Sequence, residues 1–307
     1  MRRESRPDLT STWRGSIHSS TTDVAPGRQP PDVKSAPLLK WPGGKRNLLH
    51  LILPLVPSRF NRYFEPFFGG GALFFALQPR TAFISDKNAE LIHAYSQVRD
   101  RPDAVIRELR KLRNSEVDYY RVRSSAPRNA AARAARMIYL ITLAFNGIYR
   151  VNLRGEFNVP YGYKTHLDVC DGDRIRQASE LLRGAVIRDL DFEEALRPAA
   201  GGDLVYLDPP YTVAHGANGF VKYNAKIFSW QDQIRLARTA EKLANKGCTV
   251  IVSNADHISI RRLYRGFQIA VLERNSIIAA SSDFRSRITE CIFHAGGSYD
   301  AEQRCSY

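Results

Sequence analysis

The sequence predicts a doubly wound α/β fold, in which helices cover both faces of a mainly parallel sheet. Short apolar runs typical of strands alternate with segments of helical periodicity. A run of three glycines, Gly69–Gly71, follows the first of these strands and opens a helix. This combination is typical of sheets that bind ligands at the carboxyl ends of their strands.

Each element of the sheet has its own local signal. A helix beginning at Ser229 is predicted by a capping box with Asp232 and ends near Lys246. Two earlier helices are expected over residues 72–77 and 88–98. The strands are expected at Arg62–Phe67, Thr81–Ser85, Leu204–Leu207, Thr249–Ser253, Phe267–Leu272 and Ile288–His294.

A mainly helical segment interrupts this alternation. Residues 101–146 have apolar side chains at helical spacing, and residues 146–163 contain Asn, Gly and Pro typical of a loop or hairpin. We therefore expect a sheet domain at 37–99 and 199–296, with an inserted subdomain at 100–198. Residues 1–36, rich in Ser, Thr, Pro and Arg, are expected to form a disordered tail, and residues 297–307 a C-terminal tail.

Composition excludes several classes of protein. No apolar stretch approaches the roughly 20 residues that span a bilayer, so no membrane partner is expected. The four cysteines (Cys170, Cys248, Cys291 and Cys305) are widely spaced. This spacing indicates neither a disulfide framework nor a zinc site, and it favours a reducing, cytosol-like compartment without a bound metal.

The excess of positive charge favours a polyanionic partner. The net charge is +14, and residues 99–188 hold 18 Lys and Arg against 10 Asp and Glu, a balance of 18 − 10 = +8. A basic insertion of this kind is a candidate nucleic-acid surface. The alternative is a solvated helical face rich in arginine, and composition alone does not separate the two.

The segment Asp208-Pro209-Pro210-Tyr211, at the end of a predicted strand, is the strongest candidate for a catalytic site. Its two prolines fix two φ angles and remove two N–H donors. The turn therefore presents a carboxylate, a backbone carbonyl and an aromatic ring to one small volume. These groups suit a flat heterocycle with an amino group. The alternative is a rigid strand end that binds nothing.

The glycine run and the acid that follows it indicate a nucleoside site. Glycines let a ligand approach the backbone, and Asp86, after the second strand, can accept hydrogen bonds from ribose hydroxyls. A dinucleotide fits less well, because Phe74 stands where the last glycine of a G-x-G-x-x-G run is needed. Glu65 also favours a ligand with an ammonium group over a pyrophosphate. An ordinary strand-to-helix turn is the alternative.

Two further segments carry candidate binding residues. Lys40–Lys45 departs from a P-loop, but Trp41 and Lys45 suit a loop that closes over an adenine ring and a carboxylate; a surface turn is the alternative. Within the basic insertion, residues 146–162 combine Arg and Asn, the side chains that read base edges in the DNA major groove. A structured loop with exposed arginines is the alternative there.

In this order, these segments resemble the Dam-type DNA adenine-N6 methyltransferases of the D12 class over residues 38–295. The resemblance implies a Rossmann-like methyltransferase sheet with an inserted DNA-recognition subdomain. It implies methyl transfer from S-adenosylmethionine to N6 of a flipped-out adenine in a specific duplex sequence, with GATC as the first candidate. By position it implies catalytic roles for Asp208, Pro209, Pro210 and Tyr211. The implied cofactor contacts are Trp41, Lys45, Glu65, Phe67, Gly69, Gly71, Asp86 and Asp208, and the implied DNA contacts are Arg150, Asn152, Arg154, Asn158 and Pro160.

The resemblance also implies the setting. The partner is double-stranded DNA, bound by a monomer, with a dimer on DNA as the alternative. The implied location is cytoplasmic and nucleoid-associated, for a bacterial or phage-like protein. The chain departs from the family at Val151, where some relatives carry an aromatic wedge. An N4-cytosine or RNA methyltransferase, and a non-catalytic DNA-binding protein, are the competing hypotheses. Analysis of the methylated nucleoside and a titration with S-adenosylmethionine distinguish them.

Overall fold

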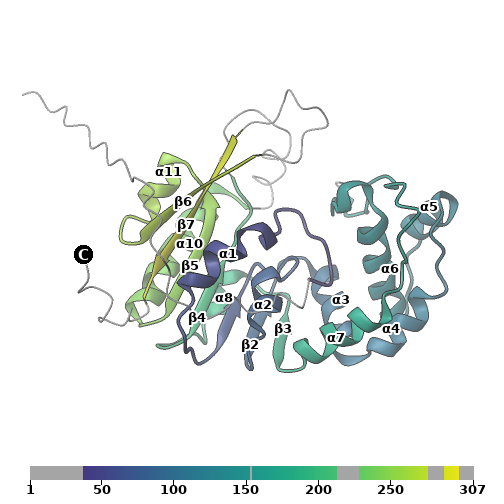
Figure 1. Ribbon diagram of the computed structural model, residues 1–307, viewed down its shortest axis with the longest axis horizontal. Coiled ribbons are helices and arrows are strands. Elements are labelled where there is room, and N and C mark those ends of the chain that lie inside the picture. The colour runs from purple at the N-terminus through teal and green to yellow at the C-terminus, as the bar shows by residue number, and fades with distance from the viewer. Residues whose placement is uncertain (1–36, 153, 213–227, 276–286, 297–307) are drawn as a thin grey trace, which may run out of the picture. The chain divides into compact units, whose positions relative to one another are not determined.

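One seven-stranded sheet, in the order β3-β2-β1-β4-β5-β7-β6, organises the computed structural model (Figure 1). The structure describes residues 37–152, 154–212, 228–275 and 287–296, so both expected tails lie outside the described residues. Strands β1 to β5 are all parallel to one another, whereas β7 runs antiparallel to its two neighbours, β5 and β6. The strands are β1 Tyr63–Glu65, β2 Ala82–Ser85, β3 Ala185–Arg188, β4 Leu204–Leu207, β5 Thr249–Ala255, β6 Gln268–Asn275 and β7 Arg287–Ala295.

The helices begin and end at local signals in the sequence. The predicted capping box at Ser229 and Asp232 is present at the start of α10, and Asn88 and Asn129 cap α3 and α6. The α-helices are α1 Leu49–Ile52, α2 Ala72–Leu77, α3 Ala89–Asp100, α4 Pro102–Leu109, α5 Glu116–Ser124, α6 Ala130–Leu143, α7 Gly172–Leu182, α8 Phe192–Leu196, α10 Trp230–Asn245 and α11 Ile258–Leu263. Short 3-10 helices are η1 Arg46–Leu48, η2 Leu53–Leu55 and η3 Phe145–Gly147.

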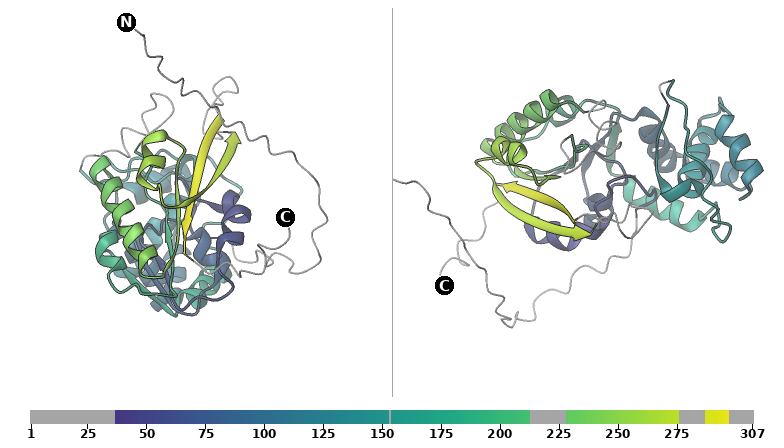
Figure 2. Two further views of the ribbon diagram at one scale, coloured as in Figure 1. Left: turned by 90° about the vertical axis from the view of Figure 1, so that its left-hand side faces the viewer. Right: turned by 90° about the horizontal axis from the view of Figure 1, so that it is seen from above.

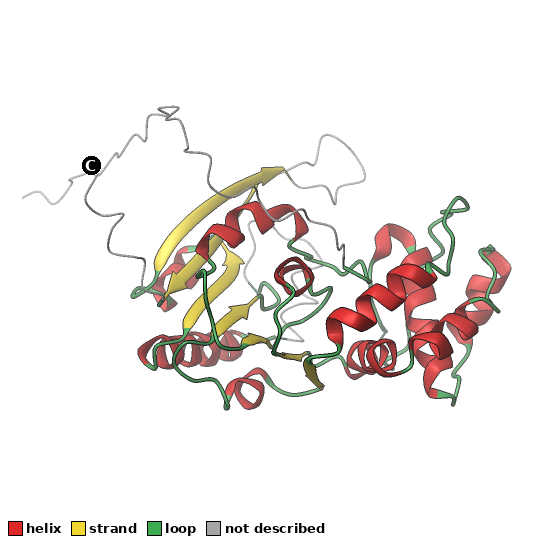
Figure 3. Cartoon of the chain, turned by 60° about the horizontal axis from the view of Figure 1, so that its bottom comes forward, coloured by secondary structure: helices red, strands yellow, loops and turns green. Residues whose placement is uncertain are grey.

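Both faces of the sheet are buried, as the apolar strands require. Alternate residues of β4 belong to two different cores: Leu204 and Tyr206 join the side chains of α1, α2 and α3, whereas Val205 and Leu207 join those of α8, α10 and α11. Figure 3 shows the red helices on both sides of the yellow strands. The predicted doubly wound α/β fold is therefore confirmed.

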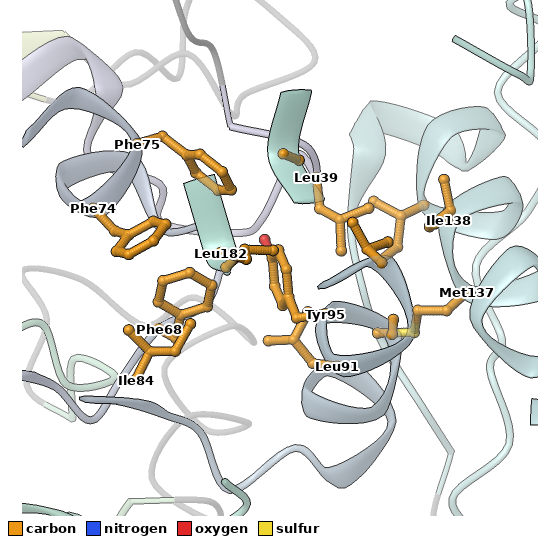
Figure 4. Packing of buried hydrophobic residues seen from close by; sticks show 14 of the residues in the cluster. Leu39, Phe68, Phe74, Phe75, Ile84, Leu91, Tyr95, Met137, Ile138 and Leu182 are labelled. Atoms are coloured by element: carbon orange, nitrogen blue, oxygen red, sulfur yellow. The ribbon is translucent and has the colours of Figure 1, made fainter. Parts of the chain in front are cut away.

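The helices between β2 and β3 extend the first of these cores. Helix α3 packs against α6 and α7, and α4 packs against the same two helices. Figure 2 shows this group of helices from two further directions. Met137 and Ile138 of α6 belong to the same buried cluster as Leu91 of α3 and Phe68 after β1 (Figure 4). A continuous apolar core thus connects the sheet to the helical segment.

The structure adds elements that the sequence did not indicate. Residues 185–188 form β3, paired with β2, although the sequence prediction put them inside the inserted subdomain. This strand has four residues, and Val186 and Arg188 are exposed, so it lacks the continuous apolar run that indicates a buried strand. Residues 46–55 form helices of three or four residues each, which are too short for their apolar side chains to give a helical period.

The pairing of β1 with β4 decides where a ligand binds. Tyr63 lies opposite Leu204, and Phe64 lies opposite Val205. Strand order runs outward in opposite directions from this pair, first to β2 and β3, then to β5 and the antiparallel strands. In open α/β sheets, ligands bind in the crevice at the carboxyl ends of such a pair.

A buried ion pair supports the amino ends of the same two strands. Asp203, before β4, is 1% exposed and accepts hydrogen bonds from the Arg62 side chain (2.6 and 3.1 Å), the Arg62 backbone N–H (3.1 Å) and the Ala200 N–H (2.9 Å). One carboxylate therefore satisfies donors from both strand entries.

We expect Asp203→Ala to lower the free energy of unfolding by about 2 kcal/mol, because it leaves a partly exposed guanidinium and two backbone N–H groups without this acceptor. Urea unfolding measures the change. The control is Asp100→Ala, which removes an ion pair to Arg99 at an exposed carboxylate and should cost less than about 1 kcal/mol. Equal losses in the two variants would contradict the role of Asp203.

Candidate active site

Three carboxylates stand at the carboxyl ends of three adjacent strands. Glu65 is the last residue of β1, Asp86 follows β2, and Asp208 follows β4. Glu65 is 2% exposed, and the other two side chains are partly buried. The topology therefore gathers three acceptors, separated by up to 143 residues in sequence (208 − 65 = 143), at the crevice between β1 and β4.

The glycine loop after β1 adopts a conformation that other residues rarely take. Gly69 and Gly71 have φ angles of +48° and +64°. A Cβ at Gly69 would lie 2.7 Å from the Trp41 ring, and one at Gly71 would lie 2.5 Å from the Phe68 ring. Both positions therefore require glycine for backbone conformation and for space. The ring of Phe68 packs beneath the loop against Phe74 and Tyr95 (Figure 4).

Asp86 holds this loop to the next strand. Its two carboxylate oxygens accept hydrogen bonds from the backbone N–H groups of Gly69 (3.0 Å) and Asn88 (2.9 Å). The Tyr95 hydroxyl donates to the Gly69 carbonyl at 3.2 Å. A carboxylate oxygen can accept more than one hydrogen bond, so Asp86 combines this structural role with capacity for a ligand. Burial raises the pKa of Asp86, and the two N–H donors oppose that shift.

The ionised form of Glu65 is strongly disfavoured in the free protein. Burial, followed by the nearby carboxylates of Asp208 and Asp86, raises its pKa well above the usual value, while the Tyr63 hydroxyl, which donates to Glu65 at 2.8 Å, opposes the shift. A cation that approaches a buried carboxyl beside other acids stabilises its ionised form. The site therefore favours a ligand with positive charge.

Lys45 contributes a cation to this acidic site. Its Nζ atom lies 2.8 Å from an Asp208 carboxylate oxygen, donates to the Gly43 carbonyl at 2.7 Å and lies 4.9 Å from the centre of the Tyr211 ring. The side chain is only 7% exposed. The structure thus brings together Lys45, Asp208 and Tyr211, three of the residues that the sequence singled out.

The turn that carries Asp208 is held by residues that the sequence analysis did not assign to the site. The Tyr211 hydroxyl donates to Glu290 of β7 at 3.0 Å, and Gln233 of α10 donates to the Pro210 carbonyl at 3.3 Å. Burial, followed by the charges of Asp208 and Glu290, raises the pKa of Tyr211, so the phenol stays protonated. A single acid inside the apolar run Ile288–Phe293 was the available signal for Glu290.

Aromatic rings line both sides of the glycine loop. Trp41 stacks on Tyr149 with ring centres 4.9 Å apart and touches the loop at Gly69. Phe67 packs between Phe192 of α8 and Phe228 before α10, at 5.6 and 5.5 Å. Trp41 therefore connects the candidate ligand site to the segment that the sequence predicted to read DNA.

That segment forms a hairpin with an internally bonded base and an exposed tip. Val151 bridges to Phe157, and the Asn152 side chain accepts the backbone N–H groups of Arg154 and Glu156 at 2.9 and 3.0 Å. Asn152 therefore shapes the turn.

Two further side chains of the hairpin bind each other. Arg150 donates to the Asn158 amide oxygen at 2.8 Å, while Arg154 is exposed near the tip and Pro160 is exposed further along. Of the five predicted DNA contacts, Arg154 has the position best suited to reach a base.

These features are typical of doubly wound enzymes that bind a nucleoside: an acidic cluster at the carboxyl ends of the central strands, and a turn that presents an acceptor beside an aromatic ring. A family model for D12 class N6 adenine-specific DNA methyltransferases matches residues 41–278. The chain belongs to this family. Its reaction is therefore the transfer of a methyl group from S-adenosylmethionine to N6 of adenine in DNA.

Curated relatives match nearly their whole length. A Type II methyltransferase, M1.LlaDCHI from Lactococcus lactis subsp. cremoris, is 40% identical over 270 residues, which cover 85% of this chain and 95% of the relative. The Type II methyltransferase M.MjaIII from Methanocaldococcus jannaschii is 34% identical, with 81% and 94% covered. The DNA adenine methylase of Escherichia coli K12 is 29% identical, with 84% and 95% covered.

Neither a membrane-spanning helix nor a cluster of metal-binding side chains is found among the described residues. Among the described residues, no helix is long and apolar enough to cross a membrane. Within those same ranges, no group of three or more His, Cys, Asp or Glu side chains is arranged to hold a metal ion. That the reaction uses no metal remains a prediction.

The raised pKa of Glu65 leads to a prediction of opposite effects on stability and binding. In the unfolded chain Glu65 ionises near pH 4.3, whereas in the folded chain it holds its proton to higher pH. Because the folded state then binds more protons, this group lowers stability as pH rises from the unfolded pKa through the folded pKa. We expect Glu65→Gln to stabilise the free protein, by an amount that grows as pH rises from about 4.3.

The same substitution should weaken binding of S-adenosylmethionine about tenfold or more, since a hydrogen bond to a charged group contributes about 1.5–3 kcal/mol. Thermal unfolding at several pH values and calorimetric titration measure the two effects. A variant that is less stable at pH 8 and binds the cofactor normally would show that Glu65 is structural.

Proposed function

We propose that Asp208, the Pro209 carbonyl and the Tyr211 ring form the methyl-acceptor site. The observation that carries this proposal is the contact of the Lys45 amino group with both Asp208 and the Tyr211 ring. The Lys45 ammonium group thus binds Asp208 where we propose that the adenine amino group binds. It also lies over the face of the Tyr211 ring on which we propose that the adenine stacks. A carboxylate acceptor and an aromatic face are therefore available to an amino-bearing heterocycle at one place.

The chemistry of adenine explains why this arrangement is useful. The N6 lone pair is delocalised into the ring, so N6 is a weak nucleophile. Two acceptors, Asp208 and the Pro209 carbonyl, draw the N6 hydrogens away from the ring plane and direct the lone pair toward the methyl donor. As the N–C bond forms, the bond between the methyl carbon and the sulfonium sulfur would break and positive charge would develop on N6. The Asp208 carboxylate would stabilise this charge and could accept the proton that N6 then loses. Positioning of this kind can contribute roughly 7–11 kcal/mol.

Entry of the base requires Lys45 to leave. Its Nζ atom forms an ion pair with an Asp208 oxygen and lies over the face of the Tyr211 ring, and the adenine must replace both contacts. The lysine side chain is long and its loop contains Gly43 and Gly44, so it can turn toward the cofactor carboxylate. This exchange keeps the Asp208 charge compensated until the base enters, since an isolated buried carboxylate is costly.

The residues at the crevice fit S-adenosylmethionine through the chemistry of their donors and acceptors. When bound, this cofactor supplies an electrophilic methyl group on a sulfonium. We propose that Glu65 accepts a hydrogen bond from the ammonium group and that Asp86 accepts from the ribose. Trp41 and Phe67 flank the adenine of the cofactor on either side of the Gly69–Gly71 loop, whose missing side chains let a ligand approach the backbone.

We propose double-stranded DNA as the substrate, bound along the hairpin and the basic helices of residues 100–184. Adenine is inaccessible inside a duplex, so the base must be flipped out, at a cost of a few kcal/mol. GATC is the first target sequence to test, because relatives are named DNA adenine methylases and the resemblance includes Asn152–Pro160. The names of two relatives, both Type II methyltransferases, support a modification enzyme. We propose that it acts as a monomer, with a dimer on DNA as the alternative.

We expect Asp208→Ala to reduce methyl transfer by at least about 10³-fold, since a carboxylate acceptor in contact with the reacting atom is lost. DNA binding should remain close to that of the unaltered protein. Incorporation of labelled methyl groups into duplex DNA measures the first quantity, and a filter or gel titration the second. Asp100→Ala serves as the matched control at an exposed acid. Near-normal methyl incorporation by Asp208→Ala would overturn the assignment.

We expect Arg154→Ala to relax the base preference at one position of the target, at a cost of about 1–3 kcal/mol for a bidentate contact. Methylation rates on a set of single-base variants of the target measure this. Arg150→Ala is the comparison, because its guanidinium already binds Asn158. If Arg154→Ala weakens all DNA sequences equally and lowers the salt slope, Arg154 contacts phosphate.

A further inference from the structure

The catalytic turn has two conformational freedoms that its prolines do not remove. Pro209 and Pro210 have fixed φ angles, but the ψ angle of Pro210 decides where its carbonyl and the following residue point. The side-chain torsions of Tyr211 decide where its ring lies. A methyl-acceptor site of the proposed kind requires both to be fixed, because the ring must lie parallel to the base beside Asp208.

Each freedom is restrained by one buried polar side chain. Gln233 donates to the Pro210 carbonyl at 3.3 Å, and Glu290 accepts from the Tyr211 hydroxyl at 3.0 Å. Gln233 is fully buried and Glu290 is 1% exposed. Buried polar groups are costly unless they are hydrogen-bonded, so these two residues restrain the turn strongly.

The orientation of the Gln233 amide is itself determined by a neighbour. The backbone N–H of Ala255 donates to the Asn254 side-chain oxygen at 2.8 Å, so the Asn254 amino group faces away from this contact. That amino group donates to the Gln233 side-chain oxygen at 3.0 Å. The Gln233 amino group is therefore the part that faces the Pro210 carbonyl, and it can only donate there.

The two restraints approach the turn from opposite faces of the sheet. Asn254 has the same parity along β5 as Val250 and Val252, which pack with α10, the helix that contains Gln233. Glu290 has the same parity along β7 as Ile292, which belongs to the core on the other face. The turn is thus held between α10 on one side and β7 on the other.

We propose that Gln233 and Glu290 are positioning residues for methyl transfer, which act through the Pro210 carbonyl and the Tyr211 hydroxyl. This inference rests on the function proposed for Asp208–Tyr211 and assigns the residues that maintain its geometry. Displacement of reacting groups by about 1 Å can cost about 10²-fold in rate. Loss of either restraint should therefore lower kcat with little effect on cofactor binding.

A double-mutant cycle tests the role of Glu290. We expect Glu290→Ala to lower kcat about 10- to 100-fold in the otherwise unaltered protein, and much less when Tyr211→Phe has already removed the hydroxyl. Glu290→Gln keeps an acceptor oxygen and should retain most of the activity. A loss from Glu290→Ala that is equal in both backgrounds, or no loss at all, would overturn the inference for this residue.

A pH profile tests the role of Gln233. In Gln233→Glu an ionised oxygen would face the Pro210 carbonyl, whereas the protonated carboxyl can donate a hydrogen bond as the amide does. We therefore expect kcat of this variant, relative to the unaltered protein, to rise as pH falls from about 8 to about 6. Gln233→Leu should be impaired with no such dependence. A pH-independent ratio for Gln233→Glu would overturn the assignment of Gln233.

Two controls separate structural damage and failure of the proposed function from failure of this inference. Ser179 lies in α7, and its hydroxyl donates a hydrogen bond to the Arg99 carbonyl. Ser179→Ala removes this bond and should lower Tm without lowering kcat. All variants are measured for S-adenosylmethionine affinity by calorimetry, which a misfolded protein would not retain. If Asp208→Ala is inactive and the Glu290 and Gln233 variants are fully active, the proposed function stands and only the positioning role is wrong.

Discussion

The parallel pairing of β1 with β4 is the constraint on which the rest of the structure depends. It joins residues 63–64 to residues 204–205, and it places the end of the glycine-bearing strand beside the end of the strand that carries the catalytic turn. Because strand order reverses there, the loops after the two strands separate and leave a crevice. The helices inserted between β2 and β3 occupy the intervening sequence without disturbing this pair.

Bringing acids together in that crevice has an electrostatic cost that shapes the site. Glu65 lies close enough to Asp208 and Asp86 for their charges to raise its pKa. Hydroxyl and ammonium groups offset this cost: Tyr63 donates to Glu65, and Lys45 lies against Asp208. The same imbalance favours a cationic cofactor and an amino-bearing base. We therefore expect these acids to lower the stability of the free protein and to strengthen binding of the reactants.

Recognition and chemistry are connected through the segment after α6. Tyr149 stacks on Trp41, and Trp41 contacts the glycine loop, so the base of the hairpin adjoins the cofactor side of the crevice. The hairpin side chains divide between roles: Asn152 and the Arg150–Asn158 pair maintain the turn, while Arg154 stays exposed at the tip. The hairpin therefore combines an internally bonded turn with an exposed arginine, as we expect of a loop that reads DNA.

The sequence by itself determined the fold class, six of the seven described strands and the helices α2, α3 and α10, whereas the roles of the site residues remain predictions. Local signals suffice for these: a capping box starts α10, apolar runs give β4 and β5, and the prolines of Asp208–Tyr211 fix two φ angles of the turn whatever surrounds it. The short edge strand β3 was missed because four partly exposed residues carry no period.

Only the tertiary structure decided which side chains meet. Nothing local relates Glu290 to Tyr211 or Gln233 to Pro210, since each contact depends on strand order and on which face a side chain occupies. The contact of Lys45 with Asp208 likewise joins segments 163 residues apart (208 − 45 = 163). Local sequence specifies backbone conformation through sterics and hydrogen bonding, whereas the partners of a buried polar group are set by packing across the whole sheet.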